Sequence, residues 1–328
     1  MRAFRCPVCG AELFFENSVC LACGSAVGYD RGLRRMAGVT PDAPVCADLD
    51  RCGCNWLADP TRSDGLCLNC ALTLTRTRPA DDDPVGLQQW WVVEDAKRRL
   101  VVELDELGLP IVVSDGYLGL AFDLLSSSRG PVTTGYHNGV ITLDLAEGDD
   151  AHREWLRHAM GEPYRTVLGT LRHEIGHYYA ELLALTTPRR DEFLTVFGDE
   201  TSSYDDALAR HYAAGPRQTW QDRFVSAYAT MHPLEDFAET FAHVLHLTDV
   251  LQTATAYGLL DRPVDLTAEP VATVVGEVWL PLTKALNQIN RSMGLSDLYP
   301  FVLAPAVVSK LAFVVDLVVA ARRSNTLP

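Results

Sequence analysis

Two histidines four residues apart, with a glutamate directly after the first, occupy residues 173–177 of the chain (His-Glu-Ile-Gly-His). Positions i and i+4 of an α-helix lie one turn apart on the same face. The imidazoles of His173 and His177 can then bind one zinc ion, and Glu174 can reach a water molecule on that ion. The spacing therefore predicts a catalytic zinc site whose chemistry is metal-assisted hydrolysis.

A catalytic zinc ion of this kind needs a third protein ligand and one open coordination position. We expect the third ligand on a helix that begins near Pro233, because proline favours the first turn of a helix. Glu235, Glu239 and His243 recur there every four residues and share a face. The positions that flank this face are apolar: Phe237, Ala238, Phe241, Val244 and Leu245. The face should therefore be at least half buried, where carboxylates need a metal ion or another partner.

Glu235 is the preferred third ligand in this interpretation, and Glu239 then accepts a hydrogen bond from a zinc-bound histidine. Asp236, Glu239, His232 and His243 remain rival ligands on the same segment. All of them carry donor atoms that zinc accepts in proteins.

The histidine motif is expected on a helix from about Tyr164 to Leu185. The apolar stripe of this helix consists of Leu168, Leu171, Ile175, Leu182 and Leu183. Gly176 lies inside the motif and lowers helix propensity by about 1 kcal/mol. A close approach of another element would explain a glycine at this position.

All nine cysteines lie between residues 6 and 70. Cys6-Pro-Val-Cys9 and Cys20-Leu-Ala-Cys23 are two CxxC knuckles, each followed by a glycine that permits a tight turn. Two such knuckles make a four-cysteine zinc ribbon, which is a tetrahedral structural site. Disulfides are a weaker interpretation because nothing indicates export, and a redox motif does not explain two paired knuckles.

A third knuckle, Cys67-Leu-Asn-Cys70, needs two partners from Cys46, Cys52 and Cys54, so that one of these three is left over. The cysteine-containing segment is too short and too poor in apolar residues to fold unaided, so zinc would supply the folding free energy. Residues 1–80 hold nine arginines, no lysine and eight acids, and four thiolates add negative charge at each site. Nucleic acid is therefore the poorer partner for these ribbons, and a protein partner is the better expectation.

The segment Arg78–Pro84 holds two prolines and three consecutive aspartates, which resist helix and strand. We expect it to separate a zinc-ribbon module with two four-cysteine sites, residues 1–80, from a second domain, residues 85–328. The second domain should open with a helix over Gln88–Leu107. Short strands should follow at Ile111–Val113, Leu118–Leu124 and Val140–Leu145. Helices dominate the remainder, which predicts an α+β fold with a small sheet and a mainly helical C-terminal part.

The chain has 328 residues, a formal charge of −15 and 48% hydrophobic residues. The hydrophobic fraction is ample for a packed core, and the acidic charge argues against a general nucleic-acid binder. No secretory signal opens the chain. The longest apolar run, Leu311–Ala321, contains Asp316 and is too short to span a bilayer, so it predicts a buried helix. We expect a cytoplasmic protein without membrane contact.

These motifs together resemble a bacterial family of zinc-ribbon-containing, zinc-binding metallopeptidases, and the similarity spans nearly the whole chain. It rests on the first four cysteines, the histidine motif, and the segments Cys54-Asn-Trp-Leu57, Cys67-x-x-Cys70 and Ser226-Ala-Tyr-Ala-Thr-x-His-Pro-x-Glu-Asp236. The resemblance implies that Cys46, Cys54, Cys67 and Cys70 form the second zinc set. Cys52 is then a local extra.

The histidine motif and Glu235-Asp-Phe-Ala-Glu239-Thr-Phe241 also resemble the gluzincin arrangement, and in particular the catalytic domain of anthrax lethal factor. In that protein the first glutamate of the second motif binds zinc, and a tyrosine seven residues earlier stabilises the transition state. The resemblance implies a zincin-like metallopeptidase domain in which Glu235 is the third ligand and Tyr228 donates a hydrogen bond to the oxyanion.

The sequence thus predicts a zinc-dependent metallopeptidase that hydrolyses peptide bonds with a zinc-bound water and Glu174 as general base. We expect about three zinc ions, one catalytic and two structural. The substrate would be a peptide or protein, and the strand Val140–Leu145 offers an edge for an extended peptide. Two alternatives are a zinc-ribbon binding or scaffold protein with an inactive peptidase-like domain, and a metal-dependent hydrolase of non-peptide amides.

Overall fold

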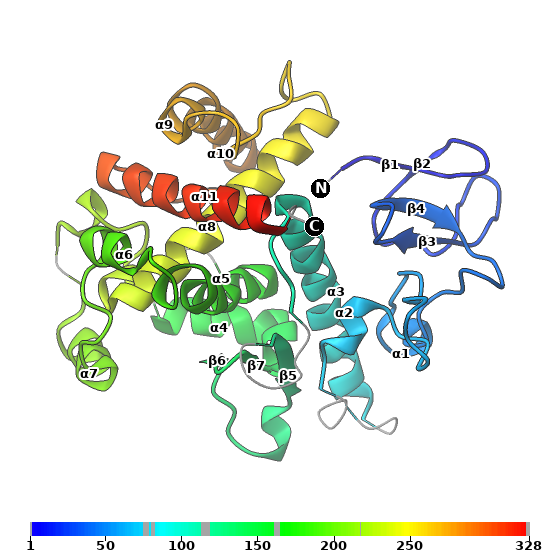
Figure 1. Ribbon diagram of the computed structural model, residues 1–328, viewed down its shortest axis with the longest axis horizontal. Helices are drawn as coiled ribbons and strands as arrows, with labels where there is room; N and C mark the ends of the chain where they lie inside the picture. The colour runs from blue at the N-terminus through cyan, green and yellow to red at the C-terminus, as the bar shows by residue number, and fades with distance from the viewer. Residues whose placement is uncertain are drawn as a thin grey trace. The chain divides into compact units, whose positions relative to one another are not determined.

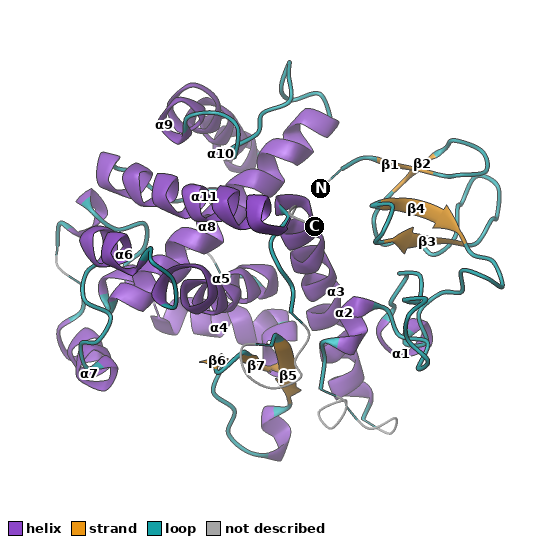
Figure 2. Ribbon diagram, in the orientation of Figure 1, coloured by secondary structure: helices purple, strands orange, loops and turns teal. Residues whose placement is uncertain are grey.

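The structure is a computed structural model that describes residues 2–74, 79, 83–112, 119–160, 165–216 and 218–325. Its first compact unit comprises residues 1–103, 111–153 and 256–259, and its second comprises residues 104–110, 154–255 and 260–328. Figure 2 shows that the described strands are few and short and that helices make up most of the C-terminal part. The predicted α+β class is confirmed.

The cysteine-containing part of the first unit is built from two β-hairpins and two short helices. Strand β1 (Phe4–Arg5) pairs with β2 (Glu12–Leu13), and β3 (Val27–Asp30) pairs with β4 (Arg35–Gly38), both antiparallel. The helices are α1 (Leu49–Cys52) and α2 (Leu68–Ala71). A cluster of buried aromatic side chains, with ring centroids 5.0 to 6.4 Å apart, joins the hairpins to the segment after α1: Phe4, Phe15, Tyr29 and Trp56.

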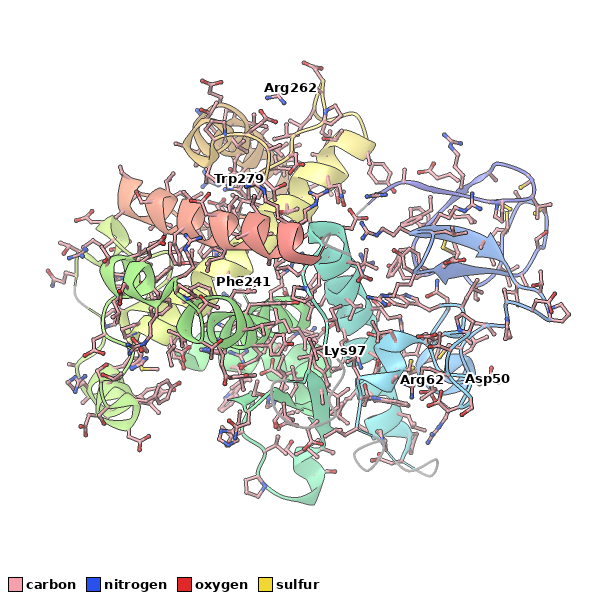
Figure 3. The ribbon with its side chains drawn as sticks, viewed as in Figure 1. Asp50, Arg62, Lys97, Phe241, Arg262 and Trp279 are labelled. Carbon is pink, nitrogen blue, oxygen red and sulfur yellow. The ribbon has the colours of Figure 1, made fainter. Side chains whose placement is uncertain are left out.

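Helix α3 (Pro84–Leu107) continues the first unit and carries a buried polar network. Lys97, which Figure 3 labels on this helix, places its ammonium 2.9 Å from Glu94 Oε1, and both side chains are fully buried. Thr73 donates to the same carboxylate oxygen, and Asn69 donates to the other at 2.9 Å. The network satisfies the buried charges and fixes α3 to the residues around α2.

The predicted helix 88–107 is confirmed at its end, where Gly108 adopts a positive φ of 69°, and it begins earlier than expected, at Pro84. Of the predicted boundary segment, residues 78 and 80–82 lie outside the described residues. The division into residues 1–80 and 85–328 therefore stays a prediction.

A three-stranded sheet completes the first unit, with strand order β5-β7-β6. Strand β5 (Ala121–Leu125) runs parallel to β7 (Val140–Asp144), and β6 (Gly135–His137) runs antiparallel to β7. The predicted alternation along β7 is confirmed, because Ile141 and Leu143 are fully buried. The expectation that this strand offers a free edge to a peptide is wrong, because β7 lies between the other two strands.

The described residues of the predicted strand Ile111–Val113 are not in a strand, and Val113 lies outside the described residues. Around the sheet, the 3₁₀ turns η2 (Ser127–Arg129) and η3 (Leu145–Gly148) lead to α4 (Asp150–Met160). Gly148 has no room for a side chain, because an added Cβ would lie 2.7 Å from the carbonyl oxygen of Gln89 on α3. The sheet connection and α3 therefore pack closely within the unit.

The second unit consists of helices in its described residues (Figure 1). They are α5 (Val167–Tyr179), continued by the π-helical turn η4 (Ala180–Leu185), then α6 (Arg190–Phe197) and α7 (Tyr204–Ala214). The short turns η5 (Trp220–Asp222) and η6 (Tyr228–Thr230) precede α8 (Pro233–Ala256). The last elements are α9 (Val271–Thr273), η7 (Val274–Trp279), α10 (Leu280–Ser292) and α11 (Pro305–Asn325).

Two of these helices carry the predicted zinc ligands, and they meet at a glycine. A Cβ added to Gly176 of α5 would lie 2.8 Å from the Cα and 3.0 Å from the carbonyl oxygen of Ala238 on α8. The expected close approach at Gly176 is confirmed. Phe237, next to Ala238, and Phe241, about one turn later, are buried, which anchors α8 in the core (Phe241 is labelled in Figure 3).

Helix α5 begins at Val167, because the Thr166 side chain accepts a hydrogen bond from the Gly169 amide at 2.9 Å and caps the helix. The predicted start, near Tyr164, lies outside the described residues. The predicted C-terminal helix is confirmed as the core of α11, where Leu311, Val314 and Val318 are fully buried. None of the helices that the structure describes is long and apolar enough to cross a membrane.

Candidate metal centres

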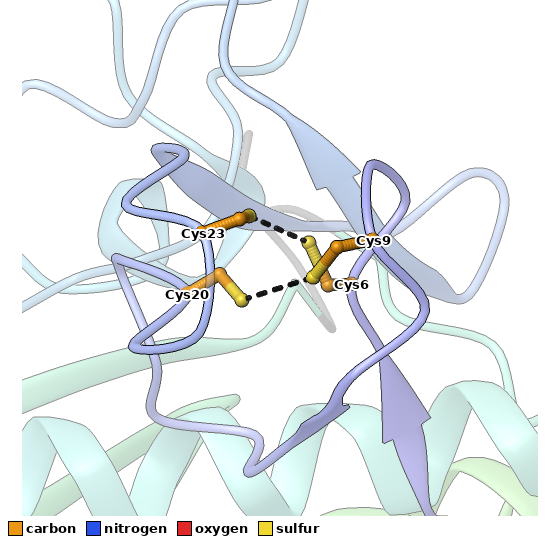
Figure 4. Close-up of side chains that lie close together, drawn as sticks. All are labelled: Cys6, Cys9, Cys20 and Cys23. Atoms are coloured by element: carbon orange, nitrogen blue, oxygen red, sulfur yellow. Dashed lines mark hydrogen bonds between the residues drawn. The ribbon is translucent and has the colours of Figure 1, made fainter.

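The first cysteine cluster joins the two knuckles (Figure 4): Cys6 and Cys9 lie between β1 and β2, and Cys20 and Cys23 lie between β2 and β3. Cys6 Sγ lies 3.7 Å from Cys23 Sγ, and Cys9 Sγ lies 3.7 Å from Cys20 Sγ. A tetrahedral zinc ion with Zn–S bonds of about 2.3 Å requires sulfur pairs roughly 3.8 Å apart, whereas a disulfide requires about 2.0 Å. Gly10 and Gly24 have φ of 75° and 73°, which confirms the expected tight turn after each knuckle. The sulfur geometry fits a tetrahedral zinc ion better than disulfides.

The second cluster is buried and consists of Cys46, Cys54, Cys67 and Cys70, whose sulfur atoms all lie within 4.8 Å of one another. Cys54 Sγ lies 3.6 Å from Cys67 Sγ, again close to a tetrahedral edge. Cys46 Sγ accepts a hydrogen bond from the Cys67 amide at 3.3 Å. Four buried sulfurs this close need a cation between them if they are thiolates.

Cys52 stands beside this cluster. Its thiol donates to the carbonyl oxygen of Asp48 at 3.4 Å, as expected of a protonated thiol on a helix. It also forms a separate close group with Cys70 and Glu94. The four-sulfur set therefore forms without Cys52.

The histidine–glutamate site brings ligand atoms from α5 and α8 together. His173 Nε2 lies 3.2 Å from His177 Nε2 and 3.0 Å from Glu235 Oε2, and His177 Nε2 lies 3.4 Å from Glu235 Oε1. Tetrahedral zinc with bonds of roughly 2.0–2.2 Å requires ligand atoms about 3.3 Å apart. Glu235 is 2% exposed as a side chain, and the histidines are 13% and 14% exposed. The donor set and its spacing fit a zinc ion, with the histidines at the open side.

Glu239 lies one turn after Glu235 and accepts a hydrogen bond from His173 Nδ1 at 2.6 Å. This contact assigns the proton to Nδ1 and leaves the Nε2 lone pair facing His177 and Glu235. Burial acts to raise the pKa of Glu239, but the hydrogen bond and charge of His173, with smaller effects of His243 and Ser226, together hold the pKa below its usual value. A carboxylate that stays ionised in this place makes His173 a better metal ligand.

Glu174 is a buried carboxylate beside the ligand atoms. Burial raises its pKa, and the neighbouring His173 and His177 act in the opposite direction. In the part of the chain that the structure describes, Glu174 Oε2 and Glu235 Oε2 are buried without a hydrogen-bond partner. Two buried carboxylate oxygens without donors agree with a site built for a cation and a water molecule.

Tyr228 faces the same site from η6, with its ring centroid 6.0 Å from that of His173. Burial, followed by the charge of Glu235, raises the pKa of its phenol well above the ordinary value. The hydroxyl therefore stays protonated and able to donate a hydrogen bond.

Residues 86–317 match the family described as "Putative zinc-binding metallo-peptidase", and residues 3–83 match a zinc-ribbon domain family. The chain belongs to this metallopeptidase family. The predicted family, with its N-terminal ribbon, is thus confirmed.

Uncharacterized proteins of Mycobacterium bovis and of two Mycobacterium tuberculosis strains are each 52% identical to this metallopeptidase family member over 325 residues. The similar region covers 96% of this chain and 94% of each relative. No solved structure matches the chain significantly.

The rival ligand candidates of the histidine–glutamate site have other contacts. Asp236 pairs with Lys310 at 2.6 Å, and burial raises its pKa to about 7 against the opposing effect of that lysine. His243 donates from Nδ1 to the Glu239 carbonyl oxygen at 2.9 Å, and its ring packs on that of Phe301 with centroids 4.5 Å apart.

His232 donates to the Ser202 carbonyl oxygen at 3.1 Å and accepts from the Leu234 amide at 3.2 Å, which occupies both ring nitrogens. Asp236 and His243 have the contacts given above. Glu235 is the residue of this segment whose carboxylate lies within 4.8 Å of the ligand nitrogens of both His173 and His177.

One residue at the site was missed by the sequence analysis. Tyr204, the first residue of α7, donates a hydrogen bond from its hydroxyl to Glu235 Oε1 at 2.9 Å. The sequence signalled only the helix start, through Ser203, whose side chain accepts from the Asp206 amide. No spacing rule connects Tyr204 with Glu235, because they belong to different helices.

Proposed function

We propose that the chain is a zinc-dependent metallopeptidase that hydrolyses peptide bonds at the histidine–glutamate site. The observation that carries the proposal is the ligand triangle of His173, His177 and Glu235, with separations of 3.0–3.4 Å and a buried glutamate beside it. Four-sulfur clusters close around an ion, whereas three ligands leave a position for water and substrate.

His173, His177 and Glu235 would hold the zinc ion. The ion, when bound, polarises the scissile carbonyl and makes water acidic enough to attack near neutral pH. Glu174 takes a proton from the attacking water as the oxygen–carbon bond forms. It then gives that proton to the amine nitrogen as the carbon–nitrogen bond breaks. Its buried position raises its pKa and so favours this reversible proton transfer.

Tyr228 would donate a hydrogen bond to the oxyanion that forms on the former carbonyl. Two observations support this role: its ring lies beside His173, and its hydroxyl keeps its proton. The arrangement also agrees with the gluzincin resemblance of the sequence, in which a tyrosine seven residues before the third ligand has this task. Losing such a donor costs about 10²–10³-fold in rate.

The cysteine clusters would bind two structural zinc ions and give about three zinc ions in all. The first ribbon also exposes apolar side chains at its knuckles, with Leu21 92% and Val8 67% exposed. We propose that this surface contacts a protein, either the substrate or a partner. We also propose a reducing compartment, the cytoplasm, because the cysteines gather in two four-sulfur sets whose spacing suits zinc-bound thiolates.

A digest of an unbiased peptide library tests the proposal. Zinc-loaded protein should cleave peptides, and 1,10-phenanthroline should stop the cleavage until zinc is added back. Cleavage that survives complete removal of the metal would contradict the mechanism. Hydrolysis of small amides alone would indicate a non-peptide hydrolase, and no hydrolysis at all would indicate an inactive scaffold.

A further inference from the structure

Tyr204 contacts Glu235, the proposed third metal ligand, for which the sequence left several rivals. Its hydroxyl donates to Glu235 Oε1 at 2.9 Å, and that oxygen lies 3.4 Å from His177 Nε2. The other oxygen, Oε2, lies 3.0 Å from His173 Nε2. A hydrogen bond to one carboxylate oxygen fixes the rotation of the whole group and so aims the other oxygen at the histidines.

Tyr204 is itself held in position through His232. The His232 ring donates to the carbonyl oxygen of Ser202, just before α7, and accepts from the amide of Leu234, in the first turn of α8. It therefore joins the start of the helix that carries Tyr204 to the start of the helix that carries Glu235. The two rings also pack together, with centroids 5.3 Å apart.

We propose that Tyr204 is a positioning residue of the metal centre, which holds the Glu235 carboxylate as a zinc ligand. This inference rests on the proposed function for its metal ion. Tyr204 does not touch the reacting atoms in this role and acts through Glu235. Residues that hydrogen-bond to a metal ligand typically contribute 10–100-fold to metal affinity or activity.

The test is the zinc affinity of the full chain with the Tyr204→Phe substitution, measured by competition with a chromophoric chelator. A variant with both His173 and His177 changed to alanine defines the signal of the cysteine sites, which is subtracted. Tyr204 is 39% exposed as a residue, so that losing its hydroxyl should leave the apo protein folded, which circular dichroism checks. Tyr212→Phe is the matched control, because Tyr212 lies on the same helix and is 68% exposed.

We expect Tyr204→Phe to weaken zinc binding at the histidine site by about 10–100-fold, and Tyr212→Phe to leave it within about threefold. In a Glu235→Ala background, titrated at zinc concentrations high enough to load the remaining histidine pair, the Tyr204 substitution should have no further effect on zinc affinity. A general loss of structure would instead weaken zinc binding both in the unchanged background and in the Glu235→Ala background.

Equal zinc affinities of the Tyr204→Phe and Tyr212→Phe proteins would overturn the proposal, and so would an undiminished effect in the Glu235→Ala background. These results do not depend on catalysis. If Tyr204→Phe weakens zinc binding as expected but the unchanged, zinc-loaded protein cleaves no peptide, the proposed function is refuted and the role of Tyr204 stands.

Discussion

The second cysteine cluster and the histidine–glutamate site differ in how the chain assembles their ligands. The cysteines lie between residues 46 and 70, all four are at most 1% exposed, and short turns bring them together. The histidine–glutamate ligands come from two long helices and retain exposed edges, at 13% and 14% of the histidine side chains. A closed set of four sulfurs suits a structural ion, and an open set of three suits a reaction.

The difference extends to what each ion does for the fold. Around the cysteines the secondary structure is sparse, with strands of two to four residues, so that the sulfur clusters replace much of a hydrophobic core. Around the histidines the helices have their own core, with Phe237, Val244 and Leu245 fully buried on α8. Removing metal should therefore unfold the first region and leave the second folded.

The largest effect expected is from a change to the second cysteine cluster. Cys54→Ala should lose one zinc ion per chain and unfold residues around α1 and α2, because structural zinc contributes about 10–16 kcal/mol of binding free energy. Elemental analysis and circular dichroism measure the two effects. Cys52→Ala is the matched control, since both cysteines are fully buried and Cys52 lies outside the four-sulfur set.

Zinc loss from Cys52→Ala together with full zinc occupancy in Cys54→Ala would show that Cys46, Cys54, Cys67 and Cys70 are not the ligands of the second zinc ion.

The next effect is catalytic and belongs to the open site alone. Glu174→Gln should lower the rate of peptide hydrolysis by about 10²–10⁴-fold while zinc content stays unchanged, because the amide cannot take the proton. Steady-state kinetics and metal analysis of one preparation check both parts. Glu192→Gln, at a glutamate side chain 55% exposed on α6, serves as the control. Full activity in Glu174→Gln would remove the general-base role.

A smaller effect concerns the helix contact that assembles the open site. Gly176→Ala places a Cβ 2.8 Å from the Ala238 backbone, so the helices must separate at a cost of about 1–3 kcal/mol. Gly276→Ala, whose added Cβ meets no atom within 4 Å, should be neutral or stabilise by up to about 1 kcal/mol.

Chemical denaturation gives both free energies of unfolding. Equal stability of the two variants would show that close contact between α5 and α8 is not needed.

Local sequence patterns predicted those parts of the sites that lie within a single helix or a single turn. The i, i+4 spacing placed His173 and His177 on one face, and the knuckles placed the cysteine pairs. The unusual glycine at position 176 correctly signalled a close neighbour, although the sequence did not identify Ala238. The apolar positions around the face of Glu235 predicted that this face is buried, and those positions are buried. They did not separate Glu235 from its rivals on the same face.

Contacts between separate helices were beyond such patterns. Tyr204 reaches Glu235 because His232 joins the starts of α7 and α8, and no periodicity contains that information. The strand over residues 140–144 was recognised from its alternation, but its central place depends on pairing with β5 and β6. Pairing order follows from the whole sheet, which a single strand does not encode.

The zinc content of variants at two neighbouring carboxylates, Glu235 and Asp236, decides whether α5 and α8 bind one ion together. Glu235 and Asp236 are both buried at the start of α8, but only Glu235 lies within 4.8 Å of both histidine ligand atoms. We expect about three zinc ions per chain in the unchanged protein and in Asp236→Asn, and about two in Glu235→Ala. Three ions in Glu235→Ala, bound as tightly as before, would contradict the shared site, and so would a loss confined to Asp236→Asn.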